Sequence, residues 1–173
     1  MLGVLKKGIS GNALKIIALI TMTIDHVGEM LFPKIAILKI LGRIAFPIFA
    51  FAIAEGCFYT RNKVKHFLMV FILGVLCQIV YCINYKSLYI GILLIFSVSI
   101  ALIYLFDKAT KSKKVSWWVL LGVCVGLTAF VMNVLPTLLP NSKLFFDYGA
   151  PGAILPVFIY AFKGKWQKII ILR

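Results

Sequence analysis

Acidic residues are scarce in this sequence, and so are charges of either sign. Its 173 residues include five Asp and Glu and two His, and charged residues make up 14% of the chain against 62% hydrophobic residues. A water-soluble domain has about 25% charged residues. The composition therefore excludes a soluble globular protein and predicts that the lipid bilayer is the solvent for most of the chain.

The sequence also lacks the cysteine and leader patterns of secreted or zinc-binding proteins. Cys57, Cys77, Cys82 and Cys124 each lie in an apolar stretch, without CxxC or zinc-ligand spacing, so we interpret them as small packing residues and predict no metal site. A thiol acyl carrier is the alternative for Cys57, which lies near a predicted helix end. The first apolar run is too long for a cleaved signal peptide, so we expect a permanent helix there.

Long apolar runs, by contrast, are abundant. A membrane crossing needs roughly 20 largely apolar residues. We therefore predict an all-α, polytopic integral membrane protein whose residues 1–173 form one bundle of about six transmembrane helices. The predicted spans are residues 13–32, 43–59, 66–85, 88–106, 115–135 and 144–162.

The basic residues indicate how this bundle is oriented. The formal net charge of +14 could suggest nucleic acid, but the lysines stand in short runs between apolar stretches, as topology signals do. The predicted outer loops contain only Lys34, Lys39, Lys86 and Lys143, and most other basic residues fall on the opposite side. The positive-inside rule then places both termini in the cytoplasm, and we expect no nucleic-acid partner.

Four of the five acidic residues lie inside apolar runs, namely Asp25, Glu29, Glu55 and Asp147. An ionisable group in lipid is costly unless it is paired or faces a cavity, so each of these residues is a candidate site residue.

The first predicted helix combines several of these groups. Lys15 and His26 are eleven residues apart, which places them on nearly the same helix face and about 16 Å apart along the axis. Asp25 and Glu29 are four residues apart, and Glu29 lies three residues after His26. A carboxylate beside an imidazole fixes its tautomer, as in many general bases. A hydrogen bond to a neighbouring helix is the alternative role for His26.

Arg43, Glu55 and Asp147 each admit more than one interpretation. Arg43 stays charged, so it must pair with a carboxylate, extend to the interface or hold an anionic ligand. Glu55 belongs to the site or simply pairs with Lys15. Asp147, followed by small residues and Pro151, caps the last helix, pairs with Arg43 or orients His26.

Several ordered motifs resemble the TraX family. These are Leu14-Lys-Ile-Ile-Ala-Leu-Ile-Thr-Met-Thr-Ile-Asp25-His26-Val-Gly28, Gly42-Arg43-Ile-Ala-Phe-Pro47-Ile-Phe-Ala-Phe, Glu55-Gly56, Tyr59-Thr-Arg61-Asn and Asp147-Tyr148-Gly149. The resemblance extends from about residue 12 to residue 163. In the first helix, the basic residue Lys15 is followed, after ten further residues, by His26. This spacing is also similar to the motif of the wider membrane acyltransferase-3 enzymes.

The resemblance implies a membrane-embedded acyltransferase of the bacterial cytoplasmic membrane, by analogy with the TraX protein that acetylates the amino terminus of conjugative pilin. It implies acetyl-CoA as the acyl donor and a peptide or glycan as the acceptor. His26 is then the catalytic candidate, supported by Asp25, Glu29, Arg43 and Asp147. The candidate residues for binding acetyl-CoA are Lys15, Glu55, Arg61, Lys63 and Lys65.

Two other functions fit the same residues. The intramembrane polar cluster could form the path of a small proton-linked transporter. The chain could also be a structural or immunity-type membrane partner that catalyses no reaction.

Overall fold

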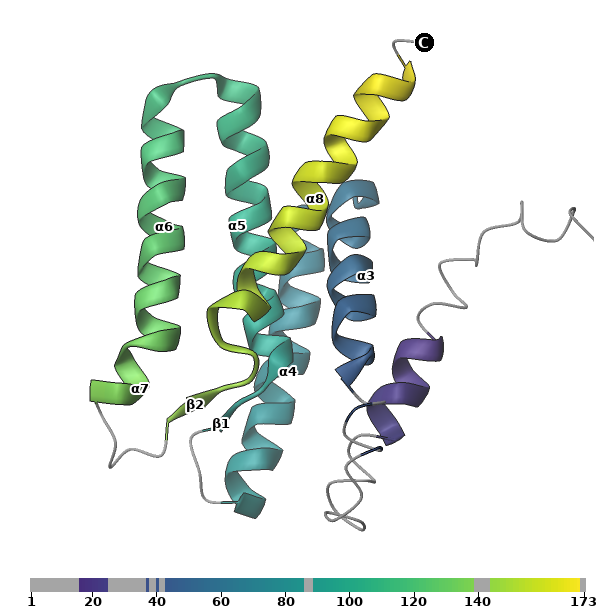
Figure 1. The fold of residues 1–173 in the computed structure, drawn as a ribbon, viewed down its shortest axis with the longest axis vertical. Helices are drawn as coiled ribbons and strands as arrows, with labels where there is room; N and C mark the ends of the chain where they lie inside the picture. Colours follow the sequence, from purple (N-terminus) through teal and green to yellow (C-terminus); the bar gives the residue numbers. More distant parts are fainter. Residues whose placement is uncertain are drawn as a thin grey trace, which may run out of the picture. The chain divides into compact units, whose positions relative to one another are not determined.

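The computed structural model describes residues 16–24, 37, 40, 43–85, 89–138 and 144–171. The chain divides into two compact units, Met1–Ala52 and Ile53–Arg173. Its described residues are mostly helical (Figure 1). In the first unit, residues 16–24 are helical and Arg43 is exposed.

The labelled elements follow one another along the chain with short connections. They are α3 (Ala45–Tyr59), α4 (Lys63–Tyr85), β1 (Tyr89–Ile90), α5 (Ile92–Ser112), α6 (Val115–Asn133), α7 (Leu135–Leu138), β2 (Phe145–Phe146) and α8 (Gly149–Ile171). Among the described residues, three helices are long and apolar enough to cross a membrane: Lys63–Ile83, Ile92–Ser112 and Val115–Asn133. Two shorter apolar helices are Ala45–Tyr59 and Gly149–Lys163.

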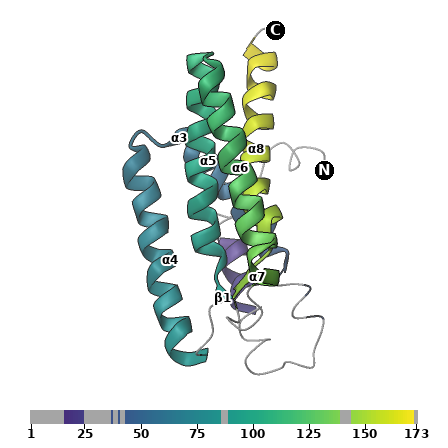
Figure 2. The same ribbon diagram turned by 90° about the vertical axis from the view of Figure 1, so that its left-hand side faces the viewer.

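Helix α5 is the central element of the second unit, because α4, α6 and α8 all pack against it (Figures 1 and 2). Its residues Ile95, Ile100 and Ile103 are almost completely buried. Ile95 belongs to a cluster with residues of α6, β2 and α8, and the other two isoleucines pack around Cys57 of α3. Helix α5 is thus the most buried of the three long apolar helices, while its neighbours keep apolar faces exposed.

Small residues let the neighbouring helices approach α5 closely. A Cβ atom on Gly74 of α4 would lie 3.1 Å from the backbone nitrogen of Leu94. On the α8 side, the buried Ser99 hydroxyl donates a hydrogen bond to the Ala153 carbonyl at 2.8 Å. Close backbone approach and a hydrogen bond between helices are the usual means of joining helices in lipid, where the hydrophobic effect does not drive helices together.

A short parallel pairing of β1 and β2 precedes α8. Tyr89 pairs with Phe145 and Ile90 with Phe146, and the Asp147 amide donates to the Ile90 carbonyl at 3.1 Å. The chain then turns through two left-handed residues, Tyr148 (φ 58°) and Gly149 (φ 53°). A Cβ at Gly149 would also lie 3.2 Å from Asn133 Oδ1. Both the left-handed backbone and this close contact therefore favour glycine at position 149.

The predicted spans agree with the helices in position but not at every boundary. The span at 43–59 matches α3, and the span at 115–135 matches α6. The span predicted at 88–106 is wrong at both ends, because β1 occupies its start and α5 continues to Ser112. Likewise, the span predicted at 144–162 begins with β2, and its helix starts only at Gly149. The all-α prediction therefore needs one correction, this two-residue strand pair. Residues 13–15 and 25–32 of the first predicted span lie outside the described residues.

Candidate functional site

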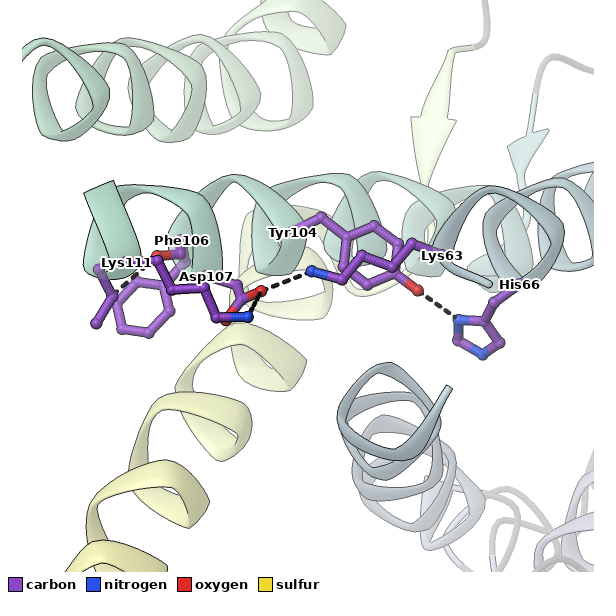
Figure 3. Close-up of polar contacts among 7 residues, drawn as sticks. Lys63, His66, Tyr104, Phe106, Asp107 and Lys111 are labelled. Atoms are coloured by element: carbon purple, nitrogen blue, oxygen red, sulfur yellow. Dashed lines mark hydrogen bonds and ion pairs between the residues drawn. The ribbon is translucent and has the colours of Figure 1, made fainter. Parts of the chain in front are cut away.

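The polar side chains of the second unit gather where α3 ends, α4 begins and α5 ends. Asn62 stands just before α4, and its Oδ1 accepts a hydrogen bond from the Lys65 amide at 3.0 Å, as a helix N-cap does. This cap fixes the first turn of α4. It thereby positions Lys63 and His66, which both reach across to α5 (Figure 3).

Asp107 is the centre of the first polar cluster. Its Oδ2 accepts hydrogen bonds from Lys63 Nζ at 2.6 Å and from Lys111 Nζ at 3.0 Å (Figure 3). The Asp107 side chain is only 15% exposed, whereas that of Lys111 is 74% exposed. The partly buried carboxylate therefore ties the start of α4 to the end of α5, and the two lysines leave the cluster positively charged.

His66 forms the second cluster, one turn further into α4. Its Nδ1 is hydrogen-bonded to Tyr104 Oη at 3.1 Å and lies 3.9 Å from Cys57 Sγ. Its Nε2 lies against Gly56, where an added Cβ would be only 2.8 Å away. Nδ1 is thus hydrogen-bonded and the Nε2 edge of the ring packs against Gly56, so His66 connects α3, α4 and α5.

A third contact joins α3 to α8. Lys163 Nζ donates to Glu55 Oε1 at 2.9 Å, and it also lies 4.9 Å from the ring centre of Tyr59. Tyr160, one turn earlier in α8, packs against Phe58 and Phe106. Four helices therefore meet at the same end of the unit through ion pairs and aromatic contacts.

Two open hollows adjoin the first cluster. The larger has a volume of about 570 Å³ and is lined by Lys63, Tyr104, Asp107, Lys108, Lys111 and Ser112. The smaller, of about 250 Å³, is lined by Lys63, Val64, Phe67, Ala101 and Tyr104. With three lysines and one carboxylate in its lining, the larger hollow suits an anionic group. Within the described residues, no group of three or more His, Cys, Asp or Glu is placed to hold a metal ion.

Some of the predicted site residues lie at the end of the second unit where α3 ends and α4 begins, and the roles of the others stay predictions. Glu55 pairs with Lys163, and its alternative partner Lys15 lies outside the described residues. Lys63 pairs with Asp107. Arg61 is exposed in the α3–α4 connection, and Lys65 is exposed in the first turn of α4.

Asp147 is half-buried in the turn before α8, two residues before its first helical residue. Arg43 belongs to the other unit, so its pairing with Asp147 stays a prediction. Lys15, Asp25, His26 and Glu29 lie outside the described residues, and their proposed chemistry stays a prediction as well.

The sequence reasoning missed Asp107, His66 and Tyr104. Asp107 is the one acidic residue outside the predicted apolar runs, directly after the predicted span 88–106. Its spacing of four residues from Lys111 was a usable signal for a continuing helix. The partners of His66 and Glu55 depend on which helices pack together, which no local pattern states.

Comparison with known proteins adds a family assignment to this geometry. The family model described as TraX protein matches residues 10–170. Uncharacterized protein RP591 of Rickettsia prowazekii (strain Madrid E) is 42% identical over 76 residues, which is 44% of this chain and 29% of that protein. The chain thus covers less than a third of that relative's length. No solved structure matches significantly.

Proposed function

The chain belongs to the TraX family, and from this premise we propose that it is a membrane-embedded acyltransferase. It moves an acetyl group from acetyl-CoA to an amine or hydroxyl of a peptide or glycan acceptor. The observation that carries the proposal is the extent of the family match: residues 10–170 include the segments around Asp25-His26, Arg43 and Asp147. The acetyl-transfer chemistry itself comes from the family analogy.

In this proposal His26 is the general base. It removes the proton from the acceptor as the acceptor nitrogen or oxygen bonds to the thioester carbonyl carbon. The carbon–sulfur bond then breaks, and the departing CoA thiolate takes up the proton from the imidazolium. Asp25 or Glu29 orients the imidazole, and Arg43 stabilises the oxyanion or fixes the acceptor, with Asp147 in support.

The basic end of the second unit supports a cytoplasmic approach of the anionic donor. Arg61 and Lys65 are exposed beside the Glu55-Gly56 motif, and together with Lys15 they would attract the phosphates of acetyl-CoA. Glu55 and Lys63 would contribute less to binding acetyl-CoA, since each is engaged in an ion pair within the protein.

We further propose about six spans with both termini in the cytoplasm. In the second unit, the α3–α4 connection, the α5–α6 turn and Lys163 stand at one end, linked through the Lys63–Asp107 and Glu55–Lys163 ion pairs. Lysines collected at one end of an apolar bundle support the positive-inside arrangement.

The proposal is tested with full-length protein in lipid nanodiscs and radiolabelled acetyl-CoA. Wild type should release CoA slowly in the absence of acceptor, and His26→Ala should lower this rate at least 100-fold, the low end of what general-base catalysis contributes. His66→Gln is the matched control, because it removes the only other histidine of the chain. We expect it to lower thermal stability while keeping most of the turnover.

Thermal unfolding of each variant separates loss of chemistry from loss of fold. A stable His26→Ala protein with wild-type turnover would contradict the proposal. So would proton-linked solute uptake into proteoliposomes without any dependence on CoA, which would favour a transporter instead.

A further inference from the structure

The two hollows at the α4–α5 junction adjoin, because both are lined by Lys63 and Tyr104. They differ in chemistry: the larger is lined mainly by charged residues, and the smaller adds Val64, Phe67 and Ala101. Ala101 and Lys111 are ten residues apart on α5, about 15 Å along the helix axis. The charged part therefore lies at the helix end and the apolar part lies further along the span.

Positive charge exceeds negative charge in the larger hollow. Asp107 neutralises only part of the charge of Lys63 and Lys111, which share its Oδ2. Lys108 adds a third cation, and its Nζ lies 3.9 Å from the ring centre of Trp117 on α6. This contact holds the ammonium group beside an aromatic ring at the end of the apolar helix, where tryptophans mark the membrane interface.

The smaller hollow opens on the surface that the apolar helices present outwards. Val64 is 67% exposed, and Ala101 is exposed as well. Both belong to helices long and apolar enough to span a bilayer. An occupant of this hollow is therefore surrounded by hydrocarbon on its outer side, so it must be apolar along this part of its length.

From this juxtaposition we propose that the hollows bind one anionic phospholipid, with its phosphate among Lys63, Lys108 and Lys111 and an acyl chain along Val64, Phe67 and Ala101. Basic pockets between membrane helices recognise anionic head groups in this way. A soluble phosphate compound matches only the charged half, because its polar remainder would have to lie against lipid. The site shares Lys63 with the residues proposed to attract acetyl-CoA, but lipid binding there does not depend on acetyl transfer.

The test compares lipid retention by full-length protein purified in mild detergent, using phosphatidylglycerol and phosphatidylcholine with identical acyl chains. Wild type should retain phosphatidylglycerol preferentially in native mass spectra. The double variant Lys108→Gln/Lys111→Gln should lower that preference roughly 30-fold, because each of the two lysines near an anionic head group contributes about 1 kcal/mol. Lys63 is left unchanged, so the tie between α4 and α5 stays intact.

The matched control is Lys113→Gln/Lys114→Gln, which removes the same charge from the adjacent turn without touching the hollow. It should keep the wild-type preference. Equal loss in both double variants would show a diffuse charge effect and overturn the proposal.

A second pair of variants tests the apolar half. Ala101→Trp should fill the smaller hollow and reduce retention of phosphatidylglycerol several-fold, whereas Val123→Trp, on an exposed face of α6, should not. If both variants retained phosphatidylglycerol as wild type does, the acyl-chain assignment would be contradicted.

Soluble competitors identify the source of the phosphate. Inorganic phosphate and acetyl-CoA at millimolar concentration should leave the retained lipid in place. Displacement of the lipid by acetyl-CoA, together with loss of acetyl-CoA stabilisation in Lys108→Gln/Lys111→Gln, would make the hollow a donor site and overturn the lipid proposal.

Discussion

Gly56 lies where the His66 ring leaves no room for a side chain. An added Cβ would stand 2.8 Å from His66 Nε2 and 3.2 Å from Cε1, and the ring is held in place by Tyr104. We therefore expect Gly56→Ala to lower the free energy of unfolding by about 1 to 3 kcal/mol, the usual cost of overpacking. Equilibrium unfolding of the detergent-solubilised protein measures this.

Gly122→Ala is the matched control, since Gly122 also lies in a helix but has no atom within 4 Å of its added Cβ. Both changes gain the same helix propensity, so their difference isolates the contact with His66. In a His66→Ala background the cost of Gly56→Ala should become smaller, because the ring that the new methyl group meets is gone. Equal stability of the two alanine variants would show that the ring moves aside at no cost.

The contrast between Glu55 and Asp107 shows how far the role of a single residue can be predicted from the sequence. Glu55 was singled out because a carboxylate inside an apolar run needs a partner, and the structure supplies Lys163. Asp107 is not a candidate in the sequence, because it follows the predicted span that ends at Phe106. The sequence thus indicates that a buried charge must be paired, but 108 residues separate Glu55 from its partner and only helix packing brings them together.

Helix α5 offers a clean comparison between two buried serines. Ser99 Oγ donates towards both the Ile95 carbonyl of its own helix and the Ala153 carbonyl of α8, whereas Ser97 Oγ bonds only within α5. Ser99→Ala should lower the free energy of unfolding by about 1 kcal/mol, and Ser97→Ala should change it by a few tenths at most. Titration with SDS checks the difference. Identical midpoints would mean that the bond to α8 adds no stability.

The bounds of α5 explain why its neighbourhood was only partly predictable. Hydropathy placed the span correctly but ended it at Phe106, because charged residues follow. The helix continues to Ser112, supported by the Asp107–Lys111 pair, and ends at Lys113, whose φ of 52° breaks the helix. Its start was missed for a different reason, since a two-residue strand such as β1 is too short to show an alternating pattern.

The positions of the two ends of α5 lead to a prediction about how the whole chain is placed in the membrane. Its 21 residues span about 30 Å, the thickness of the hydrocarbon core. The β1–β2 pair precedes its first residue and the Lys113–Lys114 turn follows its last, so these two places must lie on opposite sides of a membrane that α5 crosses.

Cysteine labelling in vesicles tests this arrangement, in a background with the four native cysteines replaced by alanine. Lys113→Cys and Phe145→Cys suit the purpose because both positions are exposed. A membrane-impermeant maleimide should modify Phe145→Cys in right-side-out vesicles and Lys113→Cys only in inverted ones, because the lysine-rich turn is cytoplasmic under the positive-inside rule. Labelling of both positions from one side would refute a spanning α5, and the reverse pattern would invert the bundle. A cytoplasmic lysine turn would put Arg61 and Lys65 on the side from which acetyl-CoA must come, since the ion pairs of Lys63 and Lys163 hold the same end together.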